Sequence, residues 1–84
     1  DNAKLGPEGA SVLAKALGKM PQLTRLDLRD NDIGDEGAIH VAIALAHAKN
    51  LEHMSIYGNK ISAQVIKHIK SALRAHLPHL KYVM

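Results

Sequence analysis

The sequence repeats itself with a period of 28 residues, and this period limits the folds that the chain can adopt. One set of residues runs Leu23, Leu26, Leu28, Asn31 and Ile33. The same positions shifted by 28 hold Leu51, Met54, Ile56, Asn59 and Ile61. A third set begins at Leu80, 29 residues after Leu51. A chain with such a period folds as a stack of similar small units rather than around one irregular core.

Each unit opens with the pattern of a short strand and a turn. Leu26 and Leu28 are two residues apart, so they lie on one face of an extended chain while Asp27 lies on the other. Asn31 comes where this strand ends, and an asparagine side chain there can bond backbone groups that no strand ladder satisfies. We expect strands of about five residues, consistent with the usual length of strands.

A helical pattern follows each turn. Apolar residues recur at i, i+3, i+4 and i+7, the spacing of one helical face. In the first two units this stripe is Ala10, Leu13, Ala14 and Leu17, and Ala38, Val41, Ala42 and Leu45. The third unit carries Val65, Ile66, Ile69 and Leu73, and its stripe is narrower because Lys70 stands at the position of Ala14 and Ala42. We therefore predict three helices of about twelve residues, close to the mean helix length in globular proteins.

Helix boundaries are marked by residues that suit helix ends. Pro7 fits a first helical turn, Gly18 fits a C-cap, and Ser62 fits an N-cap. Residues 34–37, with the sequence Gly-Asp-Glu-Gly, predict an N-cap and an acidic first turn for the second helix. Lys49 or Asn50 is expected to close that helix.

The period divides the 84 residues into a partial repeat (1–22), two complete repeats (23–50 and 51–79) and the start of a further or terminal strand (80–84). The first repeat lacks a strand, the last lacks a turn and helix, and no N-terminal cap is recognisable. Repeat stacks need polar caps at their ends. We therefore expect this leucine-rich, 84-residue domain to be a fragment of a longer chain.

The string Leu-Asp-Leu-Arg-Asp-Asn-Asp-Ile-Gly-Asp-Glu-Gly-Ala, residues 26–38, resembles the ribonuclease-inhibitor-like subfamily of leucine-rich repeats. That subfamily includes NOD-like receptors, the Ran GTPase-activating protein and the tropomodulins. The resemblance implies an α/β solenoid, a right-handed β-α superhelix of about three repeats of 28–29 residues. Its parallel sheet would line the concave side and its helices the convex side.

The strand residues that point away from the helices should form an exposed ladder. It comprises Arg25, Asp27, Arg29, His53, Ser55, Tyr57 and Tyr82, with Met84 at its end. Arg29 and Tyr57 should be lateral neighbours, close enough for a cation–π contact. Arg, Tyr and Met are enriched in protein interfaces. We predict that these residues bind a partner protein.

The titratable residues fit surface roles better than a metal centre. His40, His47 and His68 fall on helices, and His76 and His79 lie in a loop on either side of Leu77-Pro78. No two of the six histidines have the i, i+4 spacing of a helical zinc pair. An acidic cluster consists of Asp27, Asp30, Asp32, Asp35 and Glu36. Carboxylates are favourable at strand ends and helix N-termini, so we expect no metal ligands among them.

Other function classes find little support. The basic residues Lys60, Lys67, Lys70 and Arg74 lack the neighbouring aromatics that nucleic-acid stacking needs, so no nucleic-acid partner is expected. No glycine-rich phosphate loop or nucleophile arrangement appears, so we expect no catalytic residues, no cofactor and no small-molecule substrate. No apolar run approaches the ~20 residues of a membrane span. The absence of cysteine fits a cytoplasmic protein.

The sequence thus favours a non-catalytic protein–protein interaction module or scaffold that binds its partner through the concave sheet. An alternative from another class is a regulatory repeat segment of a GTPase-activating protein or of a cytoskeletal, actin-associated scaffold protein. The first would accelerate GTP hydrolysis, and the second would co-sediment with filaments.

Overall fold

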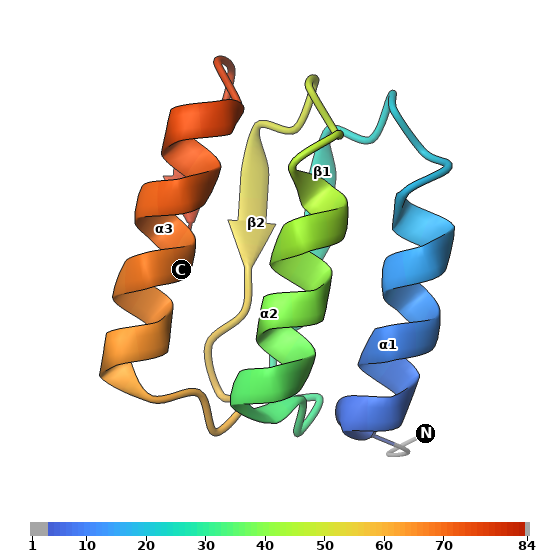
Figure 1. The fold of residues 1–84 in the computed structure, drawn as a ribbon, viewed down its shortest axis with the longest axis vertical. Helices are drawn as coiled ribbons and strands as arrows, with labels where there is room; N and C mark the ends of the chain where they lie inside the picture. Colours follow the sequence, from blue (N-terminus) through green and yellow to red (C-terminus); the bar gives the residue numbers. More distant parts are fainter. Residues whose placement is uncertain (1–3, 84) are drawn as a thin grey trace.

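A computed structural model describes residues 4–83, in which three helices alternate with three short strands (Figure 1). In chain order these are α1 (Gly6–Leu17), β1 (Arg25–Asp27), α2 (Gly34–Leu45), β2 (His53–Ser55), α3 (Ala63–His76) and β3 (Tyr82–Val83). The helices are as long as predicted, or slightly longer. β1 and β2 have three residues each, shorter than the expected five, and they end before Leu28 and Ile56, the second apolar residue of each pair.

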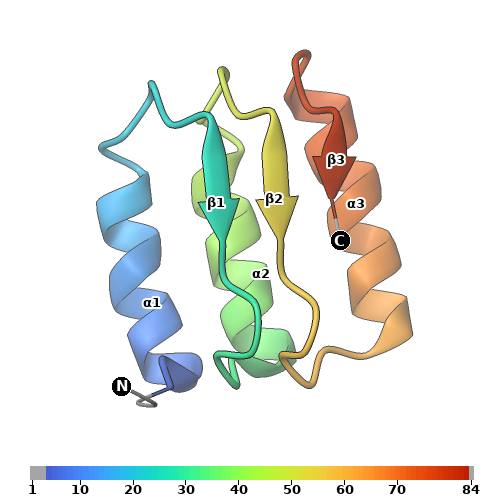
Figure 2. The ribbon, with the colours of Figure 1, turned by 180° about the vertical axis from the view of Figure 1, so that it is seen from behind.

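The strands form one parallel sheet in the order β1-β2-β3, and the helices cover one of its faces (Figures 1 and 2). In this register Leu26 pairs with Met54, and Met54 with Val83, so the repeat positions predicted from sequence lie side by side. The molecule measures 31 × 26 × 19 Å. Its smallest dimension corresponds to one layer of helices packed on one sheet, each about 10 Å thick.

The core between the two layers is aliphatic. The largest fully buried apolar side chains are Val41, Ile33, Leu45, Leu51, Met54, Ile56, Leu73 and Leu77. The chain has two aromatic residues, Tyr57 and Tyr82, and both are exposed. Burial of branched aliphatic side chains therefore supplies the hydrophobic stabilisation of the fold.

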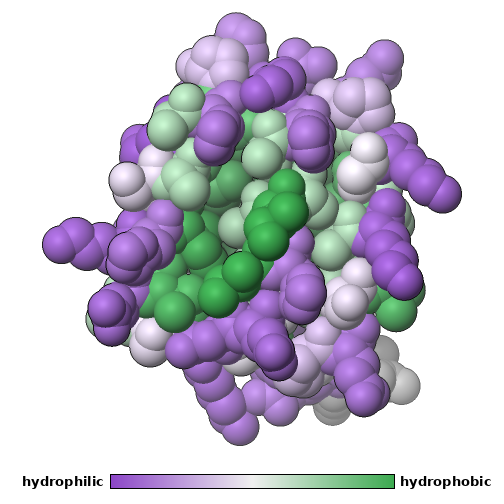
Figure 3. Space-filling model, viewed as in Figure 1, coloured by the Kyte–Doolittle hydropathy of each residue, from purple (hydrophilic) through white to green (hydrophobic). Residues whose placement is uncertain are grey.

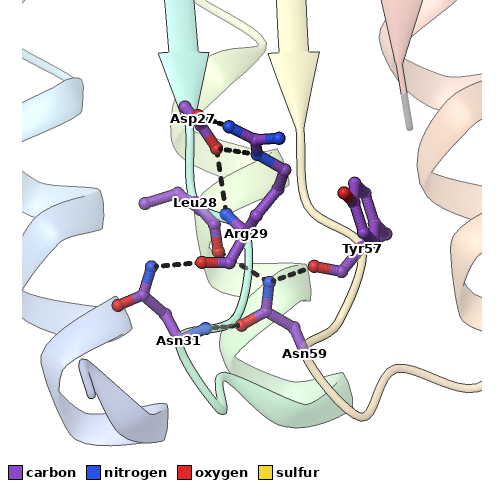
Figure 4. A network of polar contacts seen from close by, with 6 residues as sticks. All are labelled: Asp27, Leu28, Arg29, Asn31, Tyr57 and Asn59. Carbon is purple, nitrogen blue, oxygen red and sulfur yellow. Dashed lines mark hydrogen bonds and ion pairs between the residues drawn. The ribbon is translucent and has the colours of Figure 1, made fainter. Parts of the chain in front are cut away.

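Asn59 links the two repeats through its buried side chain, as Figure 4 shows. Its Nδ2 donates to the carbonyl oxygens of Leu28 (2.7 Å) and Ile56 (2.6 Å). Its Oδ1 accepts from the backbone N–H groups of Asn31 (2.8 Å) and Ile33 (3.2 Å). These backbone groups lie beyond the strand ends, so the side chain satisfies donors and acceptors that burial would otherwise leave unpaired. The predicted role of the turn asparagine is confirmed.

The start of α2 differs from the prediction. Ile33 occupies the N-cap position, and no side chain caps this helix. The N–H of Gly34 instead donates to the carbonyl oxygen of Asn59 (2.8 Å), with Gly34 at φ +74°. Asp35 accepts a hydrogen bond from the N–H of Ser62 (2.6 Å). The acidic first turn, Asp35 and Glu36, is confirmed, but the cap comes from the backbone of the next repeat.

Two helix ends also differ. α2 ends at Leu45 with Ala46 as its C-cap, not at Lys49 or Asn50, and the chain turns so that Ala48 and Leu51 become buried. α3 runs to His76, so this histidine belongs to the helix rather than to the following loop.

Other boundaries agree with the sequence. Ser62 caps α3, with its Oγ accepting from the N–H of Val65 (3.2 Å), and Pro7 lies in the first turn of α1. Gly18 is the C-cap of α1, in a right-handed conformation. Met84 falls outside the described residues. None of the helices within 4–83 is long and apolar enough to cross a membrane.

Candidate partner-binding surface on the sheet

Alternation along the strands brings the predicted ladder residues to the face of the sheet that the helices leave open (Figure 2). We call this surface the sheet face and define it by Arg25, Asp27, Arg29, His53, Ser55, Tyr57 and Tyr82. Arg25 pairs with His53, and His53 with Tyr82, so one row crosses all three strands. The rings of His53 and Tyr82 have centroids 6.4 Å apart and are tilted by 46°.

Arg29 is held by Asp27 in a bidentate ion pair (Figure 4). Its Nε donates to Asp27 Oδ1 (2.8 Å) and its Nη2 to Oδ2 (2.7 Å), while its backbone N–H donates to Oδ1 (3.1 Å). The hydrogen bonds from Arg29 lower the pKa of the Asp27 carboxyl. The hydrogen bond to Asp27, and to a smaller extent the neighbouring Tyr57, raise the pKa of the Arg29 guanidinium. The geometry fixes a flexible arginine in one orientation.

The fixed guanidinium lies beside the ring of Tyr57. The Cζ of Arg29 is 5.9 Å from the ring centroid, within the range of a cation–π contact. The lateral contact predicted from the sequence is thus present. Tyr57 remains 48% exposed and Tyr82 45% exposed, so both rings stay available on the surface.

Between these side chains the sheet face contains a depression of about 310 Å³. Its lining includes six ladder residues, from Arg25 to Tyr82, and also Leu26. Tyr57 is not part of its lining. The sequence indicated the ladder residues but not Leu26, whose half-buried side chain lies between two outward-facing neighbours.

Two further residues of the acidic cluster, Asp32 and Asp35, make ordinary surface contacts. Asp32 forms an exposed ion pair with Lys60 (3.2 Å), and Asp35 bonds the backbone of Ser62. Within residues 4–83, no group of three or more His, Cys, Asp or Glu side chains is placed to hold a metal ion. Three members of the acidic cluster thus have different partners: Asp27 pairs with Arg29, Asp32 with Lys60, and Asp35 with the backbone of Ser62.

The repeat geometry agrees with a family match. Residues 19–42, which include β1 and most of α2, match the model of the family described as Leucine Rich repeat. The chain is built of leucine-rich repeats. It is 36% identical over 67 residues to human protein NLRC5, an alignment that covers 80% of this chain. Its leucine-rich repeats are thus related to those of NOD-like receptors. The aligned part spans 4% of the length of NLRC5.

Proposed function

We propose that this leucine-rich repeat segment is a non-catalytic module that binds a partner protein through the sheet face. The placement of the tyrosines carries this proposal. Both aromatic residues of the chain stand half exposed on one surface, although burying a tyrosine in the core would remove a large apolar area from water. Tyr and Arg are the residue types that most often dominate binding energy at protein interfaces.

The Asp27–Arg29–Tyr57 arrangement supports the same conclusion. A partner that binds a free arginine must first restrict its rotamers, at a cost of about 0.5–1.5 kcal/mol for each side chain immobilised. The side chain of Arg29 is already oriented by two hydrogen bonds to Asp27, so less of this cost remains. The depression beside it offers a concave place for a side chain of the partner.

At the level of the whole repeat array, we propose a right-handed solenoid with the sheet face on its concave side. The repeat boundaries proposed from the sequence, 23–50 and 51–79, place one strand and one helix in each unit. The same proposal includes that this segment acts as a scaffold and binds its partner protein in the cytoplasm.

A pull-down from cytosolic extract tests the proposal. The wild type is compared with the double variant Arg29→Glu, Tyr57→Ala on the sheet face, and with His40→Ala, Lys67→Ala on the helices as a matched control. Circular dichroism first establishes that all three fold. A partner retained by the wild type and the control but lost by the sheet-face variant supports the proposal. A partner lost only by the helix-side variant contradicts it.

The GTPase-activating alternative requires an arginine that can reach a transferring phosphoryl group. Arg29 is engaged by Asp27, which favours a binding role for this residue over a catalytic one. Acceleration of GTP hydrolysis that Arg25→Ala or Arg29→Ala abolishes would support the alternative instead. Co-sedimentation with actin filaments tests the cytoskeletal variant.

A further inference from the structure

Arg25 is an exposed cation in the lining of the depression on the sheet face. The ion pairs found among residues 4–83 join Arg29 to Asp27, Lys60 to Asp32 and Lys81 to Glu52, and none of them includes Arg25. A guanidinium has five N–H donors in a planar fork that fits a carboxylate. The charge and the donors of Arg25 are therefore available to a ligand.

Asp27 is the acidic residue of the sheet face, and Arg29 compensates its charge. Both carboxylate oxygens of Asp27 accept hydrogen bonds from Arg29, Oδ1 from the backbone N–H and from Nε, and Oδ2 from Nη2. A basic side chain of a partner would have to compete with this bidentate pair, and such pairs are among the stronger hydrogen-bonded ion pairs in proteins. Because the pair adds no net charge, the charge of Arg25 sets the sign of the depression.

The remaining polar groups that line the depression can donate hydrogen bonds. His53 pairs with Arg25 on one side and with Tyr82 on the other, so these three side chains form one row across the sheet. Ser55 and Tyr82 each supply a hydroxyl group to the lining. An ionised carboxylate only accepts hydrogen bonds. A guanidinium, an imidazole and two hydroxyl groups around one depression thus match a carboxylate in both charge and hydrogen bonding.

We propose that the depression on the sheet face binds an acidic side chain, Asp or Glu, of the partner protein, with Arg25 as its ion-pair partner. This inference rests on the function proposed above and names the chemistry that the sheet face recognises. The volume of about 310 Å³ lies at the lower end of the range for ligand pockets, which suits a single side chain of the partner. A nucleic acid is matched less well, because its binding relies on several cations at successive phosphates.

The test begins with a phage-displayed library of random peptides, selected for binding to the 84-residue chain. Peptides of about ten residues are long enough to cross three strands spaced about 4.8 Å apart. Peptides can also bind the helix side, where Figure 3 shows an apolar band and where Ile39 and Ile43 stand exposed beside a cleft of about 420 Å³ between α2 and α3. NMR shifts of the chain therefore identify the peptides that contact the sheet face. These should be enriched in Asp or Glu relative to the library.

A double-mutant cycle then assigns the ion pair to Arg25. The acidic residue of a sheet-face peptide is replaced with its amide, and Arg25 of the chain is replaced in the variant Arg25→Gln. Each change alone should weaken binding by about threefold to fivefold, the upper range for a solvent-exposed ion pair. Both changes together should weaken it no further than one alone, because they remove the same interaction. Lys67→Gln is the matched control, since it removes an equal charge from α3, away from the depression. It should leave the preference for the acidic peptide unchanged.

Three results would overturn this proposal and leave the function proposed above standing, because each requires peptides on the sheet face. They are sheet-face peptides without acidic residues, additive effects in the double-mutant cycle, and an equal loss of preference in Lys67→Gln. Absence of any peptide on the sheet face would contradict both proposals. Binding of oligouridine or of a phosphoserine peptide to the same amides, without binding of carboxylate peptides, would assign the depression to a nucleic acid or to a phosphorylated partner instead.

Discussion

Two asparagines at equivalent repeat positions differ in how much they hold together. Asn59 is buried and satisfies backbone groups of its own turn and of the preceding repeat. Asn31 is half buried, donates to the Arg29 carbonyl (3.1 Å) and accepts from the N–H of Leu5 at 3.4 Å. Residues of the same type at the same repeat position thus contribute unequally, because burial decides what an unmade hydrogen bond costs.

Replacing Asn59 with alanine should strongly destabilise the fold. The variant leaves buried N–H and C=O groups without partners, each at a cost of roughly 1–3 kcal/mol. We expect the free energy of unfolding, measured by urea denaturation, to fall by about 3 kcal/mol. Asn50→Ala is the control, because Asn50 is exposed and makes one long bond to Pro21 (3.4 Å). Equal losses in the two variants would contradict the assigned role of Asn59.

The Asp27 carboxyl should titrate below the ordinary aspartate pKa of about 3.9. Its hydrogen bonds to Arg29 lower its pKa in the folded state. Any stability from this pair is therefore present above the ordinary pKa and is lost as pH falls through the lowered value. A ¹³C NMR titration of the folded chain should show the low midpoint, and Arg29→Ala should return it to the ordinary range. An unchanged midpoint in that variant would exclude Arg29 as the cause.

At the scale of elements, α1 packs closely on α2, and a small residue at their contact makes this possible. A Cβ on Gly37 would clash with the side chain of Ile33 and lie 3.1 Å from Cβ of Ala10 on α1. This glycine lets α1 and α2 approach closely. Between α2 and α3 the helices remain apart, and the cleft lined by alanine and histidine side chains results.

Gly37→Ala should destabilise the chain, while Gly18→Ala should not. The added methyl at Gly37 overpacks the α1–α2 contact, which typically costs about 1–3 kcal/mol. At Gly18 the φ angle is −62° and the nearest atoms to a new Cβ are 3.6 Å away, so alanine fits and should stabilise by about 0.4–1 kcal/mol. Thermal unfolding of both variants measures the difference. Destabilisation of similar size at both sites would argue against close packing at Gly37.

The sequence predicted those element boundaries that depend on local chemistry. Ser62 caps α3 with its own side chain, so the signal lies within one segment. The start of α2 depends on the carbonyl oxygen of Asn59, a residue of the next repeat, and no local pattern reveals it. Ala46 and Ala48 favour helix, yet the helix stops at Leu45, since burial of Ala48 overrides propensity.

The sequence also predicted part of the sheet face, namely which residues form it, but not all of its side-chain contacts. Strand alternation gave its members and the Arg29–Tyr57 contact, because a parallel register at a fixed period sets lateral neighbours. The Asp27–Arg29 pair depends on a side-chain rotamer, which the period does not determine. The cleft between α2 and α3 depends on the spacing of two helices. The sequence shows Ile39 and Ile43 but not the space beside them.

At the scale of the molecule, each unit contacts its neighbours in the stack, as expected for leucine-rich repeats. β2 pairs with strands on both sides, and α2 lies between two helices (Figure 1). Among the helices that the structure describes, α3 packs against α2 alone, and the cleft lies between the two helices, so less of the surface of α3 is in contact with the rest of the stack. Stability should therefore vary along the chain rather than be uniform.

Hydrogen exchange should reveal this gradient. Amides of α2 and β2 should exchange most slowly, and those of α3 measurably faster, because local opening needs less energy where fewer buried contacts break. Mass spectrometry or NMR of the 84-residue chain gives the protection of each helix. Protection in α3 equal to that in α2 would mean that the stack opens only as one cooperative unit.

The aliphatic core has a consequence for observing the molecule by its own optical signals. The chain contains no tryptophan or phenylalanine, so near-ultraviolet absorbance and emission come from Tyr57 and Tyr82 alone. Both rings are about half exposed and meet water while the chain is folded. A protein that covers the sheet face would exclude that water and alter the tyrosine spectrum. The molecule thus carries a built-in reporter of occupancy of this face.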